Sequence, residues 1–277
     1  MGEYNIKTKT SDKCRVYPDN PGGIAPSVTS ITACLMKWAL VDWAANCAVD
    51  YLYDMLGCEG NYDWGKIANE ARVAHKDISK EARDKGTDIH ELCQVWLESF
   101  HMESQNVKFA ELMETADENA VAMIHSFIEW CTKNKIEPVH IEIKLHGDGY
   151  SGRCDLVAYR TCPKTGERRL GLYDIKTGKG SYYPEWGLQL GAYAEALEYM
   201  NLFSRQTLLP ADEIGISEIG IIKLNKDTLK CNFSEQSKPK FTAQREMLTK
   251  AFLHLKDFYW AFNDLAAQFR TIDEGEG

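Results

Sequence analysis

The sequence has no apolar run that approaches the roughly 18 residues needed to cross a membrane. Its first residues, MGEYNIKTKTSDK, lack the apolar core that a secretion signal requires. Ile6 stands where an N-myristoylation motif has Ser or Thr. We therefore expect no membrane association and a cytoplasmic location.

Closely spaced cysteine pairs are also missing. The chain has nine cysteines, but no two of them form a C-x-x-C pair. Zinc ribbons and ferredoxin-type clusters need such closely spaced thiolates. The pattern instead favours reduced and mostly buried cysteines, which are typical of a reducing compartment.

Positive charge is in short supply, because 32 Lys and Arg stand against 41 Asp and Glu and give a net charge of −9. This balance argues against a broad, non-specific coat of nucleic acid. A local basic groove remains compatible with it, since phosphate contacts require only a few well-placed Lys and Arg side chains.

The patterns along the chain predict an α/β protein. Residues 1–26 hold several Pro and Gly residues and are expected to form an irregular N-terminal arm. We expect the remainder, 27–277, to be a single domain in which helices flank a central sheet. Its parts are a helical region over 27–134, a sheet core over 135–232 that includes one helix, and a closing C-terminal helix over 240–270.

Two carboxylates are predicted to face each other on neighbouring strands. The segment CPKTGE, at 162–167, has turn chemistry, and a turn centred within it places Asp155 opposite Asp174. Strand alternation puts Lys176 on the same face as Asp174. Facing carboxylates repel unless a cation lies between them, and Mg²⁺ favours sites with one or two carboxylates.

A plainer interpretation of this segment is a surface hairpin whose acids pair with Lys176 and Arg153. A phosphate-binding loop does not fit, because six residues separate Gly171 from Gly178 and Gly follows Lys179 where the motif needs Ser or Thr.

Helical residues on either side of the hairpin add further polar groups. His90 follows GTDI on a predicted helix, although a lone helical histidine is more often structural. Gln189 and Tyr193 are spaced i, i+4 and share one helix face. This face could hold a nucleic-acid backbone, or it could carry one core aromatic and one solvated amide. The aromatics ahead of that helix, Tyr182, Tyr183 and Trp186, could stack on bases or pack on the core.

Four motifs together resemble the RecB-type nuclease family of the PD-(D/E)XK superfamily, whose order is GTxxH, GxxD, DxK and QxxxY. The stretch PSVTSI at 26–31 also resembles the start of single-domain phage and mitochondrial exonucleases of this type. The resemblance covers about residues 26–200. The matching residues are Gly86-Thr87-Asp88-Ile89-His90, Gly152-Arg153-Cys154-Asp155, Asp174-Ile175-Lys176 and Gln189-Leu190-Gly191-Ala192-Tyr193.

The resemblance implies a restriction-endonuclease-like core, with a central mixed sheet flanked by helices. It implies that His90, Asp155, Asp174 and the Ile175 carbonyl bind the metal. Lys176 is expected to act on the attacking water or the scissile phosphate. Glu142 lies where relatives often carry an acid and is expected to be a second-tier member of the site. The expected DNA-binding residues are Gln189, Tyr193, Arg153, Lys179, Ser27 and Thr87.

The expected cofactor is Mg²⁺ or Mn²⁺, which suits one imidazole and two carboxylates with open positions. Some relatives carry four cysteines for an iron–sulfur cluster, three of them near the C-terminus. Only Cys231 lies beyond residue 162 here, so no cluster is expected. A helicase segment is also missing, so we expect a free-standing nuclease or one that uses the motor of a partner.

We expect a nuclease acting on DNA ends, single- or double-stranded, in recombination, repair or replication in a bacterial or phage-infected cell. Exonuclease action is favoured over endonuclease action. A recombinase, a single-strand-binding protein or a helicase are the expected kinds of partner, and a homo-oligomer is possible. The alternatives are a non-catalytic DNA-binding or assembly protein on the same fold, and an RNA-directed phosphodiesterase.

Overall fold

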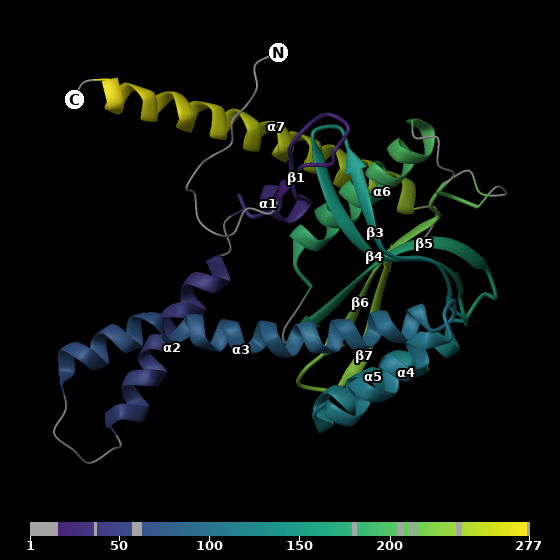
Figure 1. Cartoon of the computed structure of the whole chain (residues 1–277), viewed down its shortest axis with the longest axis horizontal. Helices are drawn as coiled ribbons and strands as arrows, with labels where there is room; N and C mark the ends of the chain where they lie inside the picture. Colours follow the sequence, from purple (N-terminus) through teal and green to yellow (C-terminus); the bar gives the residue numbers. More distant parts are fainter. Residues whose placement is uncertain are drawn as a thin grey trace.

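The computed structural model describes residues 16–35, 38–56, 63–178, 182–203, 208–210, 213, 215–236 and 240–275. The predicted class is confirmed: the chain is an α/β protein with a five-stranded mixed sheet flanked by helices (Figure 1). The predicted helical N-terminal region and C-terminal helix are both present.

Helices precede and follow the sheet in the chain. The first five helices are α1 (Val28–Thr32), α2 (Trp38–Leu56), α3 (Trp64–Glu98), α4 (Ser104–Thr115) and α5 (Glu118–Lys133). The last two are α6 (Pro184–Phe203) and α7 (Lys240–Gly275). Polar caps explain several starts: Asp63 accepts from the N–H groups of Gly65 and Lys66 at the start of α3, and Asp117 accepts from Ala120 N–H at α5.

The sheet consists of β3 (Glu137–Gly147), β4 (Tyr150–Thr161), β5 (Arg168–Gly178), β6 (Glu218–Asn225) and β7 (Lys230–Gln236). These strands lie side by side in chain order. The pair β5–β6 is parallel and the other three pairs are antiparallel. The crossover α6 makes the parallel pair possible, because parallel strands need a long connection.

The turn between β4 and β5 sets the predicted register. The ladder pairs Leu156 with Tyr173 and continues to Thr161 opposite Arg168, which is the register expected from the CPKTGE turn. Gly166, at φ +71°, supplies the left-handed backbone of this turn. The ladder ends one pair before Asp155 and Asp174, so the two acids lie just past its hydrogen-bonded part.

The sheet has a hydrophobic core on each face. Helices α1, α6 and α7 contribute to one core together with residues such as Val157, Leu172 and Ile221. Helices α3 and α5 contribute to the other with Leu156, Tyr173 and Ile222. The alternation of neighbouring residues between the two cores follows from the strand period of two.

Helix α6 is buried on several sides because it lies between the sheet and α7. A Cβ added to Gly191 would be 3.0 Å from the backbone carbon of Leu248 in α7, so glycine permits the close approach of the two helices. In contrast, α2 and the first part of α3 extend away from the sheet as a helical hairpin (Figure 1).

The described part of the predicted N-terminal arm is more regular than expected. Two short antiparallel strands, β1 (Val16–Tyr17) and β2 (Ala25–Pro26), form within it. Asn20 fixes the turn between them to the sheet, since its amide donates to the carbonyls of Gly147 and Tyr150. These long-range bonds could not be foreseen from the Pro and Gly content, which predicted an irregular segment.

Five of the seven described cysteines, Cys47, Cys93, Cys131, Cys154 and Cys162, are buried, and the seven are free thiols. This agrees with the prediction of mostly buried, reduced cysteines. None of the helices within the described ranges is long and apolar enough to cross a membrane.

Candidate active site

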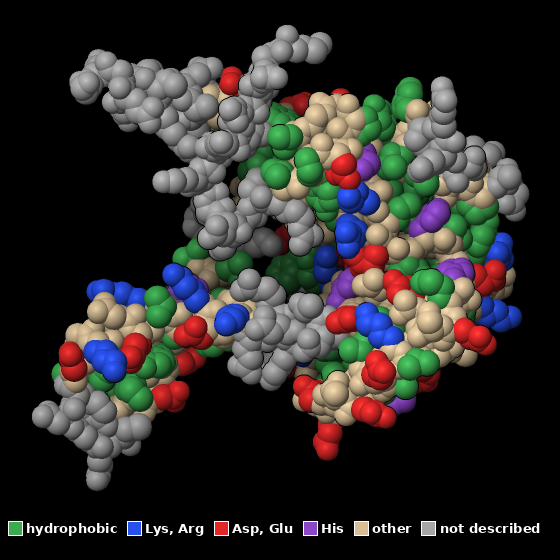
Figure 2. Space-filling view, in the orientation of Figure 1, with side chains coloured by type: hydrophobic (Ala, Val, Ile, Leu, Met, Phe, Trp, Pro, Cys, Tyr) green, Lys and Arg blue, Asp and Glu red, His purple; other side chains and the backbone are tan. Residues whose placement is uncertain are grey.

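Three neighbouring strands and one helix place five polar side chains at one end of the sheet. Glu142 comes from β3, Asp155 from β4, and Asp174 and Lys176 from β5, while His90 comes from α3. Figure 2 shows a hollow in the molecule between the α2–α3 hairpin and the part that holds the sheet, with basic, acidic and histidine side chains on its border.

His90, Glu142 and Asp155 converge, with one ligand atom from each lying within 4.8 Å of the others. His90 Nε2 is 3.1 Å from Asp155 Oδ2, and His90 Nδ1 is 3.7 Å from Glu142 Oε1. All three side chains are partly exposed. The arrangement joins helix α3 to two neighbouring strands.

Asp155 also holds the end of β5 in place. Its Oδ2 accepts a hydrogen bond of 2.6 Å from the N–H of Ile175. The carboxylate therefore replaces a ladder bond just where the β4–β5 ladder ends. This contact fixes the backbone between Asp174 and Lys176 relative to β4.

Beside this triad lies Asp174, which is buried and forms an ion pair with the partly exposed Lys176. Asp174 is 1% exposed, and its Oδ2 lies 2.5 Å from Lys176 Nζ. This ammonium partners Oδ2, whereas Oδ1 is buried and has no hydrogen bond within the described part of the chain. Unsatisfied buried carboxylate oxygens are costly, and they are common where a cation is meant to bind.

Glu142 is held in a strained backbone conformation. Its φ is +52°, in the left-handed region that glutamate rarely adopts. Its neighbours in β3 keep the sheet register, with Ile141 paired to Leu156 and Ile143 to Cys154. Strain of this kind, about 1–3 kcal/mol, persists where surrounding structure enforces it and clusters at functional sites.

Glu142, which the sequence predicted only as a second-tier member of the site, is therefore as central to the cluster as His90 and Asp155. The turn signal Asp148-Gly149 could have revealed this. A hairpin centred on that dipeptide places Glu142 opposite Asp155, in agreement with the observed register.

Burial and mutual repulsion raise the pKa values of two carboxyl groups in this cluster. Burial, partly offset by Lys176, raises the pKa of Asp174 from 3.8 to about 6. Burial and the nearby Asp155 charge raise the pKa of Glu142. Raised carboxyl pKa values mean that the cluster holds its negative charge at an energetic cost without a cation.

For the two basic groups, the surroundings favour the charged form instead of disfavouring it. Burial disfavours the charged form of His90, but the Asp155 hydrogen bond and the nearby carboxylates outweigh it and raise the pKa of the imidazole. The pKa of Lys176 is also raised, because Asp174 and Asp155 outweigh the burial of its ammonium. Both side chains therefore compensate part of the cluster's negative charge.

Helix α6 brings Gln189 and Tyr193 to the other side of the sheet end. The Gln189 amide donates to the Tyr193 hydroxyl at 2.8 Å, and both side chains are buried. Gly152 makes room for the tyrosine, since a Cβ there would be 2.4 Å from Tyr193 Cε1. The GxxD and QxxxY motifs thus contact each other directly, through Gly152 and Tyr193.

The remaining predicted DNA-binding residues differ in their placement. Arg153 is half exposed and its guanidinium is 3.7 Å from Glu142. Ser27 is 2% exposed, and its hydroxyl caps α1 by accepting from Ser30 N–H at 2.9 Å. Burial and capping leave this hydroxyl unavailable to DNA in this structure. The side chain of Thr87 and the whole of Lys179 lie outside the described residues.

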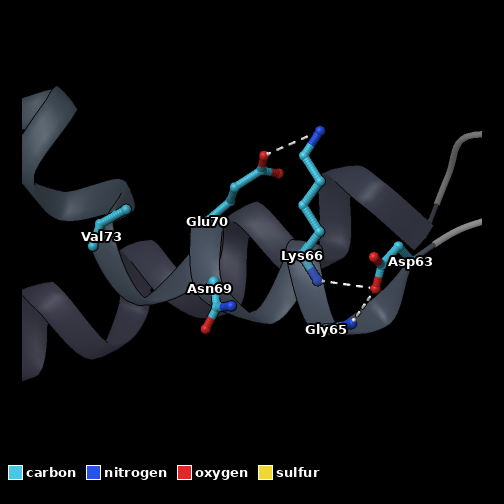
Figure 3. Close-up of a pocket in the computed structure, with 6 residues that line it drawn as sticks. All are labelled: Asp63, Gly65, Lys66, Asn69, Glu70 and Val73. Carbon is cyan, nitrogen blue, oxygen red and sulfur yellow. Dashed lines mark hydrogen bonds and ion pairs between the residues drawn. The ribbon is translucent and has the colours of Figure 1, made fainter.

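A shallow depression lies elsewhere, at the start of α3 (Figure 3). Asp63 caps the helix there, and Lys66 and Glu70 form an exposed ion pair of 3.9 Å. These contacts account for its polar groups as ordinary helix-start interactions. The depression shares no residue with the cluster around Asp155.

No protein-family model and no curated protein matches the chain. Among solved structures, it is similar to an alkaline exonuclease (LHK-Exo) from Laribacter hongkongensis, at 13% identity and a TM-score of 0.30, over 64% of this chain and 93% of that chain. The complex of LHK-Exo with dAMP gives 14% identity and 0.29 over the same shares. The crystal structure of SSO0001 gives 12% identity and 0.23 over 78% of this chain and 86% of that chain.

Proposed function

We propose that the chain is a metal-dependent deoxyribonuclease that hydrolyses phosphodiester bonds at DNA ends. The supporting observation is the convergence of His90, Glu142 and Asp155 beside the buried Asp174 and its partner Lys176. A purely structural ion-pair network satisfies its buried carboxylates. Here Glu142 Oε1 and Asp174 Oδ1 lack a hydrogen bond in the described structure.

The donor set fits a hard divalent cation, because carboxylate oxygens and one imidazole suit Mg²⁺ or Mn²⁺. Asp155, Asp174, Glu142 and His90 are the proposed ligand side chains, together with the carbonyl of Ile175. When bound, Mg²⁺ or Mn²⁺ would neutralise charge on the phosphodiester and lower the pKa of a water.

Lys176 is the proposed electrostatic partner of the scissile phosphate. Its raised pKa keeps the ammonium charged over the neutral range. Asp174, at 2.5 Å, fixes the position of that ammonium before any substrate arrives. A pre-positioned cation stabilises charge that develops on phosphate oxygens without a reorganisation step.

The rest of the proposed DNA path runs along helix α6. Gln189 and Tyr193 are buried in α6 and are therefore proposed to position the DNA strand through their packing, while the half-exposed Arg153 contacts the DNA from β4. Thr87 and Lys179 remain proposed contacts of the same backbone. The proposal includes exonuclease action on DNA ends. It also includes cooperation with a recombinase, a single-strand-binding protein or a helicase.

The decisive experiment compares DNA topologies. An end-labelled linear duplex, a linear single strand and a covalently closed circle are incubated with Mg²⁺ or Mn²⁺, beside an RNA of the same sequence. We expect the linear DNAs to be degraded to mononucleotides and the circle to persist. Cleavage of the circle would show endonuclease action, and preferential RNA cleavage would favour an RNA-directed phosphodiesterase.

A lysine variant tests the assignment of residues. Lys176→Met should lower the turnover number by at least about 100-fold, since removal of one pre-positioned charge-stabilising group typically has that effect. Lys230→Met is the matched control, because Lys230 is exposed on β7. Full activity of Lys176→Met, or DNA binding by wild type without cleavage under any divalent metal, contradicts the proposal.

A further inference from the structure

Helix α3 connects the candidate active site with the α2–α3 hairpin. It is one continuous helix of 35 residues, and His90 lies near its C-terminal end. Each residue of an α-helix turns the chain by about 100° and advances it by about 1.5 Å. Arg72 stands 18 residues before His90 and Lys76 stands 14 residues before it. Both therefore lie within about 40° of the His90 face, about 27 and 21 Å away along the helix.

The face that carries Arg72 and Lys76 points away from the packing between α2 and α3. Ile67, Ala71 and Ala74 are buried where the two helices meet, and they lie about 100° or more around the helix from His90. Arg72 and Lys76 are both exposed. Figure 2 shows Lys and Arg side chains on the edge of the hairpin that borders the hollow. These two cations are thus accessible to a ligand that extends from the active site along α3.

Positive charge is concentrated on this face, although the whole chain has a net charge of −9. Arg72 and Lys76 are spaced i, i+4, and no Asp or Glu stands three or four positions from either of them. Like charges at this spacing destabilise a helix. The guanidinium of Arg72 donates to a neutral group, the amide oxygen of Asn69, at 3.0 Å. No carboxylate at helical spacing offsets the two charges, and such a pattern suits a polyanion.

Lys80 follows at the next i+4 position, but its surroundings differ. Asp77 stands three positions before it and Asp84 four positions after it, both at the spacing of helical ion pairs. Its charge therefore has ordinary helical partners in the sequence. For this reason we restrict the assignment to Arg72 and Lys76.

A DNA duplex that leaves the active site along α3 meets these two cations in turn. Phosphates of one strand are about 3.4 Å apart along B-form DNA, so 21 and 27 Å correspond to about six and eight nucleotides. Duplex DNA is stiff over this length and stays aligned with a straight helix. We infer that Arg72 and Lys76 bind backbone phosphates about six to eight nucleotides from the scissile phosphodiester. This inference rests on the proposed function and makes α3 a guide for the duplex behind a DNA end, recognised by charge and not by sequence.

The experiment compares two DNA hairpins with the same open end and duplexes of different length behind it. Twelve base pairs extend about 41 Å, past both cations, whereas four base pairs extend about 14 Å and stop before Lys76. Arg72→Met/Lys76→Met should lower kcat/KM about tenfold on the long hairpin, through a higher KM, and leave the short hairpin unchanged. It should also reduce by about two the slope of log kcat/KM against log salt on the long hairpin.

Matched variants separate position from net charge. Lys66→Met/Lys133→Met also removes two exposed charges, one from another side of α3 and one from α5, and should change neither hairpin. Arg72→Lys/Lys76→Arg keeps both charges and should retain wild-type activity, because phosphate contacts of this kind depend on charge. Urea denaturation verifies that each variant folds. If Arg72→Met/Lys76→Met does not fold, Lys76→Met alone replaces it, with an expected loss of about threefold on the long hairpin.

Equal losses on both hairpins, an equal loss in Lys66→Met/Lys133→Met, or no loss on the long hairpin overturns the inference. Failure of the proposed function looks different, because wild type then cleaves neither hairpin with Mg²⁺ or Mn²⁺. In that case fluorescence anisotropy in EDTA with the labelled long hairpin still tests the guide. Weaker binding by Arg72→Met/Lys76→Met than by Lys66→Met/Lys133→Met supports it. Equal binding by the two, or no binding by wild type, refutes it.

Discussion

Replacing Asp174 by Asn should stabilise the metal-free protein relative to wild type, and more so at neutral than at acidic pH. The carboxyl is 1% exposed, so solvent screens its charge little. Its pKa rises from 3.8 to about 6 in the folded protein. Folded wild type therefore binds this proton more tightly than the unfolded chain, and its stability falls as pH rises through that window.

The magnitude follows from the same pKa values. One pKa unit corresponds to about 1.4 kcal/mol, so the ionised carboxyl costs the folded protein about 3 kcal/mol above pH 6. Roughly 2 kcal/mol of this cost develops between about pH 4.5 and about pH 7.5. Asp174→Asn lacks the titrating group, so its stability does not carry this pH-dependent cost.

The measurement is urea denaturation in EDTA at these two pH values, with the free energy of unfolding of the variant minus that of wild type as the readout. We expect the difference to become more positive by roughly 2 kcal/mol at the higher pH. Asp148→Asn is the matched control, because the side chain of Asp148 is 83% exposed. A difference that stays constant between the two pH values refutes the reasoning. Mg²⁺ or Mn²⁺ should stabilise wild type at the higher pH and affect Asp174→Asn much less.

Substitutions at three other positions test particular features of the structure. Gly152→Ala should lower the free energy of unfolding by about 1–3 kcal/mol in denaturant titrations, because its Cβ meets the Tyr193 ring. Glu142→Gly should be about 1 kcal/mol more stable than Glu142→Ala, since only glycine relaxes a φ of +52°; calorimetric melting of both variants checks this. Arg160→Met should cost about 3–5 kcal/mol in chemical denaturation, as it removes the bidentate partner of fully buried Glu218. If Gly152→Ala or Arg160→Met is as stable as wild type, or Glu142→Gly is only as stable as Glu142→Ala, the corresponding prediction is wrong.

Much of the fold could be predicted from local sequence because its signals are local. Turn residues at 162–167 set the β4–β5 register, and strand alternation set the faces of Asp174 and Lys176. The switch from helical to strand patterns after residue 134 coincides with the change from α5 to β3. Each of these features depends on residues that are near one another in the chain.

Long-range contacts could not be predicted from the sequence, because they join residues that are far apart in the chain. Asn20 fixes the β1–β2 turn through bonds that span 127 and 130 residues, and no local pattern encodes them. The contact between Gly152 and Tyr193 joins two motifs that appear independent in the chain. The burial of Ser27, which was expected to bind DNA, depends on the packing of α1 against the sheet.

The sequence by itself identified the residues that we propose carry the chemistry, since the types and spacing of the acids, the lysine and the histidine are local properties. Tertiary structure decided how they combine. It brought His90 from α3 to the acids of β3 and β4 and set Glu142 among them with a strained backbone. These outcomes depend on which strands become neighbours and how closely helices pack, and both are settled only when the two cores close around the sheet.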